Sequence, residues 1–114
     1  MRIALRRLLR SADLDVDTFA SGADFIDSLE TRTPDCVVLD LQMPQVDGFA
    51  VQRHLATAEG RPPVVVITGH DSEEAREQAH SNGASAYLRK PVDGGRLLQA
   101  IAAAISGARS GRHV

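Results

Sequence analysis

Three residues of different chemical type stand at the ends of short apolar runs. Asp40 follows CVVL, Thr68 ends VVVIT, and Lys90 follows AYLR. If these runs are parallel strands, their carboxyl ends share one edge of a sheet, where ligands bind. A carboxylate, a hydroxyl and an ammonium together suit phosphoryl chemistry: the carboxylate attacks phosphorus to form an acyl phosphate, and the other two groups hold the phosphoryl oxygens. Taken singly, each has a plainer interpretation: a polar strand end, an ordinary strand residue and a solvated lysine. Their joint placement favours the chemistry.

The elements that must position these residues alternate between helical and strand patterns along the chain. We expect helices over residues 2–12, from Ser21 through Leu29, over 49–58, from a cap at Asp71 or Ser72 to Asn82, and after Asp93. We expect strands at Asp15–Phe19, Cys36–Leu41, Val64–Thr68 and Ala86–Arg89, with a strand over residues 1–5 as a weaker alternative to the first helix. Such alternation predicts an α/β fold, in which helices cover both faces of a parallel sheet.

The composition is that of one folded domain. The 114 residues are 43% hydrophobic and 25% charged with a net charge of -2, so there is no basic excess to bind nucleic acid. No apolar run is long enough to span a membrane or to form a signal peptide, and we expect a cytoplasmic protein. The single cysteine, Cys36, is interpreted as a small buried hydrophobe. We assign residues 1–106 to the domain and 107–114 to a frayed tail.

Four segments resemble the receiver domain of bacterial two-component response regulators. PDCVVLDLQMPQVDGF, PPVVVITGHD, NGASAYLRKPVD and LLQAI stand in the order and at the separations typical of that family, and the resemblance extends over nearly residues 2–106. It implies a flavodoxin-like three-layer fold. It also implies that Asp40 is a phosphoacceptor, phosphorylated by a sensor histidine kinase or a phosphotransfer protein, and that Thr68 and Lys90 contact the phosphoryl group.

The resemblance implies roles for two further residues. Tyr87 is similar to the aromatic switch residue that couples phosphorylation to a protein-binding face; a plain half-buried aromatic is the alternative. Gln42 stands where the family's backbone carbonyl binds Mg²⁺ beside the acceptor. The sequence leaves open whether the Lys90-Pro91 bond is cis or trans.

One part of the family pattern has no counterpart here. Family members begin with a strand that ends in a pair of acidic residues, which complete the Mg²⁺ site, whereas this chain starts inside the next helix. Since Mg²⁺ prefers octahedral oxygen ligands, we expect its binding to be weakened or lost and phosphorylation to be slow or absent.

The missing strand also affects the sheet, which should have four strands per chain. In the flavodoxin-like order 2-1-3-4-5 the absent strand lies between 15–19 and 36–41. Strand 15–19 can move over to pair with 36–41, a homodimer can complete the sheet, or the start at Met1 can be a truncation.

Two functions from different classes remain in competition. One is a phosphorylated receiver that signals through a downstream protein partner. The alternative is a phosphorylation-independent interaction module, which the missing acidic pair favours. An enzyme, such as a phosphate-ester hydrolase that uses Asp40, is less well supported, since no acid/base helper or Gly-rich phosphate loop is visible.

Overall fold

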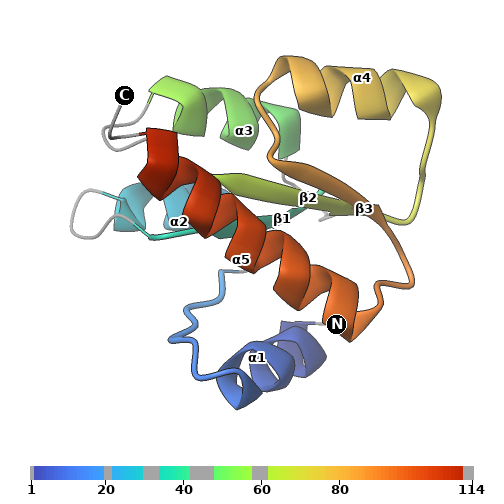
Figure 1. The fold of residues 1–114 in the computed structure, drawn as a ribbon. Coiled ribbons are helices and arrows are strands. Elements are labelled where there is room, and N and C mark those ends of the chain that lie inside the picture. Colours follow the sequence, from blue (N-terminus) through green and yellow to red (C-terminus); the bar gives the residue numbers. More distant parts are fainter. Residues whose placement is uncertain (1, 20–21, 30–33, 42–47, 58–61, 112–114) are drawn as a thin grey trace.

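The computed structural model describes residues 2–19, 22–29, 34–41, 48–57 and 62–111, with backbone alone at 2–5 and 108–111. Its elements are α1 (Arg2–Ser11), α2 (Gly22–Ser28), β1 (Val37–Asp40), α3 (Gly48–Thr57), β2 (Val64–Thr68), α4 (Glu73–Ser81), β3 (Ala86–Arg89) and α5 (Gly94–Gly111), as Figure 1 shows. The predicted bounds of β2 and β3 are confirmed, and the first helix is confirmed against the alternative strand.

The described strands form one parallel sheet in the order β1-β2-β3. Val37 pairs with Val64 at the start of the sheet, and Thr68 pairs with Arg89 at its other end. All five residues of the central strand β2 are buried, because helices cover both of its faces. The parallel pairing brings the carboxyl ends of all three strands to one edge.

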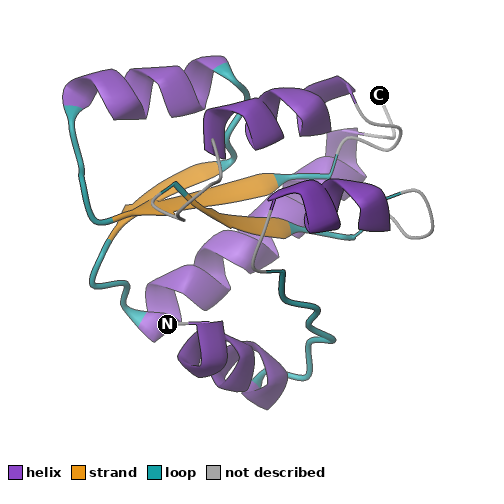
Figure 2. Cartoon of the chain, turned by 180° about the vertical axis from the view of Figure 1, so that it is seen from behind, coloured by secondary structure: helices purple, strands orange, loops and turns teal. Residues whose placement is uncertain are grey.

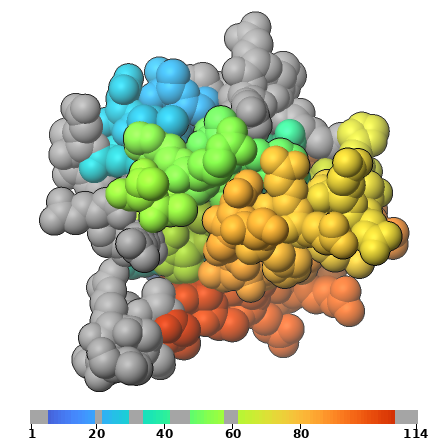
Figure 3. All heavy atoms as spheres, turned by 90° about the horizontal axis from the view of Figure 1, so that it is seen from above, coloured from blue at the N-terminus to red at the C-terminus, as the bar shows by residue number. Residues whose placement is uncertain are grey.

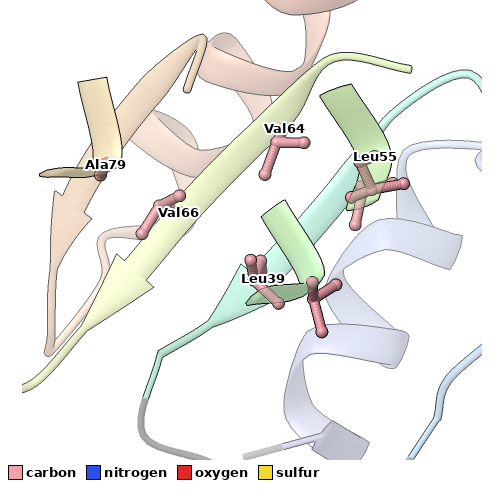
Figure 4. Packing of buried hydrophobic residues seen from close by; sticks show 7 residues of the cluster. Leu39, Leu55, Val64, Val66 and Ala79 are labelled. Carbon is pink, nitrogen blue, oxygen red and sulfur yellow. The ribbon is translucent and has the colours of Figure 1, made fainter. Parts of the chain in front are cut away.

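Two hydrophobic clusters hold the helices to the two faces of the sheet. On one face α2, α3 and α4 pack on β1 and β2, and Figure 4 shows Leu55 and Ala79 beside Leu39, Val64 and Val66. On the other face, side chains of α1 and α5 pack around Val65. Figures 1 and 2 show the sheet between these layers, and in Figure 3 α3 lies between α2 and α4 on the outer surface. The result is a three-layer α/β sandwich.

The prediction of a strand at Asp15–Phe19 is wrong, and with it the count of four strands. Residues 14–19 have no regular secondary structure, and the described part of the chain forms three strands. A strand needs a neighbour for its backbone hydrogen bonds, and none of the described strands pairs with this segment. Leu14 and Val16 instead pack against the cluster around Val65. The proposed move of this segment to pair with β1 is therefore also wrong for the single chain.

The ends of the last helices follow their capping residues. Ser72 caps α4 by accepting a hydrogen bond from the Ala75 N–H at 3.0 Å, and Gly83 follows its end with a φ of 93°, which favours glycine. Asp93 caps α5 through the Arg96 N–H at 3.0 Å. Helix α5 continues to Gly111, past residue 107, where we placed the start of the tail. Ser21, predicted to begin α2, lies outside the described residues.

Candidate functional site

Asp40 and Lys90, fifty positions apart in the sequence, form an ion pair at the carboxyl edge of the sheet. Asp40 is the last residue of β1, and Lys90 directly follows β3. The Lys90 Nζ donates a hydrogen bond to Asp40 Oδ2 at 2.6 Å, and the two side chains are 24% and 21% exposed. Since β2 lies between β1 and β3, the pair reaches across the end of the central strand. Both charges are thus largely withdrawn from water and hold each other in place.

Thr68 ends the strand between them and is 2% exposed. Its carbonyl accepts a hydrogen bond from the Lys90 N–H at 2.8 Å, which fixes the backbone of the lysine. Its hydroxyl accepts from the His70 N–H at 3.1 Å. A hydroxyl can also donate one hydrogen bond, and the described residues show no acceptor for it. The structure therefore places all three predicted residues at one edge of the sheet.

The backbone just after Asp40 is held on two sides. The Leu41 N–H donates to the Ile67 carbonyl at 3.0 Å, which extends the pairing of β1 with β2 by one residue. Gly48 packs against Leu41 so closely that a Cβ there would lie 2.6 Å from Leu41 Cδ2 and 3.2 Å from Leu41 Cα. A larger residue would require the Leu41 side chain to move and would crowd its backbone, so glycine favours this close approach of α3 to the end of β1.

The described residues do not by themselves fit the Mg²⁺ site that the resemblance implies. They contain no group of three or more His, Cys, Asp or Glu side chains that could hold a metal ion. Asp40 Oδ2 is already engaged by the Lys90 ammonium. Gln42, the predicted carbonyl ligand, lies outside the described residues. Because Mg²⁺ prefers six oxygen ligands, one carboxylate is a poor match.

Tyr87, the predicted switch residue, is half-buried on β3 beneath a charged pair. Its ring lies 5.8 Å from the Arg76 guanidinium carbon, and Arg76 pairs with Asp71 at 2.9 Å. Arg89 lies 4.0 Å from the same carboxylate. Burial, followed by the neighbouring Asp71 carboxylate, raises the pKa of Tyr87. Its hydroxyl is buried and makes no hydrogen bond of regular geometry with the described residues.

Sequence reasoning placed Asp71 and Arg76 at the start of a polar helix but gave them no role beside this ring. Asp71 belongs to the segment that follows Thr68, so the chain itself joins the strand end to the surroundings of Tyr87. No periodic pattern marks Asp71 or Arg76, since both are exposed or half-buried polar residues near the start of a polar helix. The role of Tyr87 as a switch stays a prediction.

The structure also shows the geometry of the Lys90-Pro91 bond and the surroundings of Cys36. The Lys90-Pro91 peptide bond is cis. Burial raises the pKa of the Cys36 thiol to about 11, so the thiol is protonated at neutral pH and makes a poor nucleophile.

Comparisons with known proteins agree with this geometry. The family model of the response regulator receiver domain matches residues 1–102, and the chain belongs to that family. It is 36% identical over 106 residues to the DNA-binding transcriptional regulator NtrC of Klebsiella pneumoniae. The matched region covers 93% of this chain but only 23% of that relative. The chain thus spans about a quarter of that relative's length and corresponds to its receiver domain, a phosphoacceptor module of two-component signalling.

Solved structures show the same fold. A response regulator receiver protein from Burkholderia phymatum is 44% identical, with a TM-score of 0.79 over 91% of this chain and 85% of that one. A CheY-like receiver domain from Methanospirillum hungatei reaches a TM-score of 0.89 at 19% identity, over 96% and 88% of the two chains, and supports the fold alone. The flavodoxin-like α/β class is confirmed. In the described part of this chain, no helix has both the length and the apolar character needed to cross a membrane.

Proposed function

We propose that Asp40 is the residue that accepts the phosphoryl group from the phosphohistidine of a sensor kinase or phosphotransfer protein. A carboxylate oxygen attacks phosphorus and forms an O–P bond. The N–P bond breaks, its electron pair returns to the imidazole, and the imidazole takes up a proton from solvent. The observation that supports this role is the 2.6 Å pair between Asp40 and Lys90 at the carboxyl edge of the sheet.

In this proposal Lys90 and Thr68 bind the transferred group. The ammonium exchanges its contact with Asp40 Oδ2 for the phosphoryl oxygens, and the Thr68 hydroxyl donates its hydrogen to one of them. Receiver domains in general bind Mg²⁺, but the described residues supply only part of such a site. Lys90 then carries most of the charge neutralisation, and we expect phosphorylation to be slow and weakly dependent on Mg²⁺.

Incubation with acetyl phosphate and MgCl₂, followed by intact-mass analysis, tests the acceptor. We expect slow gain of one phosphoryl group, loss of that gain in Asp40→Asn, and release of the label by hydroxylamine, which cleaves acyl phosphates. Asp35→Asn is the matched control, because Asp35 is an exposed carboxylate five residues earlier on the same segment. Label that survives in Asp40→Asn would assign the acceptor elsewhere.

If neither acetyl phosphate nor a phosphorylated phosphotransfer protein labels the wild-type chain, phosphoryl acceptance is lost. The phosphorylation-independent interaction module would then be the better description. The downstream protein partner, the cytoplasmic location and the lack of nucleic-acid and membrane partners stay predictions.

We also propose a homodimer that forms along β1. Among the described residues, β1 has β2 as its one strand neighbour. The N–H groups of Val37 and Leu41 donate hydrogen bonds toward β2. Because successive N–H groups of a strand point in opposite directions, the N–H of Val38 points toward the other edge of β1. An open strand edge favours pairing with a second copy. Light scattering during size exclusion tests this, and a monomer at micromolar concentration would remove the dimer.

A further inference from the structure

Asp71 lies between the candidate site and the surroundings of Tyr87. It belongs to the short segment that joins the end of β2 at Thr68 to the start of α4 at Glu73 (Figure 1). The neighbouring His70 is exposed, whereas the side chain of Asp71 is 18% exposed. An acidic side chain in a surface segment is usually exposed, and one that is largely withdrawn from water is usually paired. The contacts of Asp71 therefore show what holds this segment.

The Asp71 carboxylate joins the segment to a helix and to a strand. Arg76 Nη2, on α4, donates to Asp71 Oδ2 at 2.9 Å and to Oδ1 at 3.2 Å. Arg89 Nη1, on β3, lies 4.0 Å from Oδ2. Hydrogen bonds between charged groups are stronger than those of a neutral turn. The carboxylate thus restrains the segment toward both elements.

The same contacts cover Tyr87. The Arg76 guanidinium carbon lies 5.8 Å from the centre of the ring, and the Tyr87 hydroxyl is buried. The Asp71 carboxylate lies close enough to contribute, after burial, to the raised pKa of that hydroxyl. A movement of the segment away from β3 would take Asp71 from the hydroxyl and Arg76 from the ring. Tyr87 would then be exposed.

The segment also supplies a donor to Thr68. The N–H of His70, the residue directly before Asp71, donates to the Thr68 hydroxyl at 3.1 Å. Because the hydroxyl accepts this bond, its own hydrogen points in another direction. A displacement of Asp71 would pull the His70 N–H away and let the hydroxyl rotate.

We propose that Asp71 is a positioning residue that closes the segment between β2 and α4 over Tyr87 and, by the same contact, keeps the His70 N–H on the Thr68 hydroxyl. Asp71 acts through Arg76 and through the backbone of the segment, not on a reacting group. Loss of its charge lets the segment open. The role belongs to the unphosphorylated chain, so it stands whether or not Asp40 accepts a phosphoryl group.

Amide hydrogen exchange of His70 tests the closure of the segment. Asp71→Asn keeps the shape of the side chain and removes its charge. We expect the His70 amide to exchange about fivefold faster, the shift that loss of one partly exposed ion pair gives. The amides of Val65 and Val66, in the buried strand β2, should exchange as in the wild type, because the opening is local.

The fluorescence of Tyr87 tests its cover. Tyr87 is the one tyrosine of a chain without tryptophan, so the intrinsic fluorescence reports its surroundings alone. After correction for the fluorescence lifetime, acrylamide should quench Asp71→Asn more strongly than the wild type. Glu77→Gln is the matched control, because Glu77 is an exposed carboxylate beside Arg76 on α4, and it should behave as the wild type in both measurements.

A double variant separates the ion pair from independent effects of its two residues. Arg76→Met should speed the exchange of His70 by a similar factor, and Asp71→Asn with Arg76→Met should exchange no faster than either single variant, because all three lack the same contact. Effects that multiply in the double variant would overturn the proposal. So would unchanged exchange or unchanged quenching in Asp71→Asn, or an equal acceleration at Val66.

Discussion

Replacing Lys90 by methionine removes the ammonium of the Asp40–Lys90 pair and keeps a side chain of similar length. At 2.6 Å and an effective dielectric constant of about 20, the gross attraction is about 6 kcal/mol, most of which desolvation offsets. Exposed pairs contribute about 0–1 kcal/mol, and breaking a fully buried pair costs about 3–5 kcal/mol. With side chains 24% and 21% exposed, we expect Lys90→Met to lower the free energy of unfolding by about 2 kcal/mol.

The partner substitution should cost less. In Asp40→Asn the lysine ammonium can swing into solvent on its flexible stem, so we expect a loss of about 1 kcal/mol. The double variant should cost no more than Lys90→Met, since no charge then remains unpaired. The resulting coupling energy of the double-mutant cycle is at least about 1 kcal/mol.

Urea unfolding followed by circular dichroism measures all four proteins, at low salt and in added NaCl. Arg89→Met is the matched control: the neighbouring side chain is 71% exposed and lies 4.0 Å from Asp71, so its loss should cost less than about 0.5 kcal/mol. Because the Asp40–Lys90 pair is largely buried, salt should weaken its coupling only slightly. A coupling within error of zero, or one that salt abolishes, would show that solvent separates the two groups and that the site is not held as described.

Three further outcomes follow from single side chains. Thr68→Val removes the acceptor of the His70 N–H and should cost about 1 kcal/mol in urea unfolding, and an unchanged midpoint would contradict that bond. In the folded protein the pKa of the Cys36 thiol is raised from 9.0 to about 11. At about pH 8 this lowers the thiolate fraction about a hundredfold, and the greater nucleophilicity of a thiolate with a higher pKa offsets part of that loss. We therefore expect the folded thiol to react with iodoacetamide roughly tenfold more slowly than the unfolded thiol. Since the unfolded thiol ionises first, the free energy of unfolding should fall as the pH rises from 9 toward 11; equal alkylation rates would refute the burial. Tyr87→Phe removes a buried hydroxyl that lacks a regular hydrogen bond, so stability should stay equal or rise, and a loss above about 1 kcal/mol would show that Asp71 bonds to it.

Local sequence patterns predicted β2, the strand that is buried on both faces. The run of five β-branched residues from Val64 to Thr68 follows two prolines, and the structure has the strand within those bounds. The segment Asp15–Phe19 has an alternating pattern but no strand structure, because a strand depends on a neighbouring edge that sequence spacing does not show. Its apolar residue Val16 is partly buried against the cluster around Val65 instead.

The candidate site was predictable to the extent that sheet topology determines it. Parallel strands place Asp40, Thr68 and Lys90 at one edge whatever the details of packing. The charged pair over Tyr87 depends on how α4 sits on the sheet. That placement follows from many packing contacts acting together, which single-residue patterns do not encode.

The position of Asp40 at the edge of the described sheet changes what holds it in place. A strand with neighbours on both sides is fixed by two rows of backbone hydrogen bonds, whereas β1 has one, toward β2. The close contact of Gly48 with Leu41 and the ion pair with Lys90 supply restraint from other directions. Opening of β1 therefore breaks the ion pair, and loss of the ion pair loosens β1. Local opening of this strand, measured by amide exchange of Leu39 and Leu41, should be faster in Lys90→Met than global unfolding alone explains.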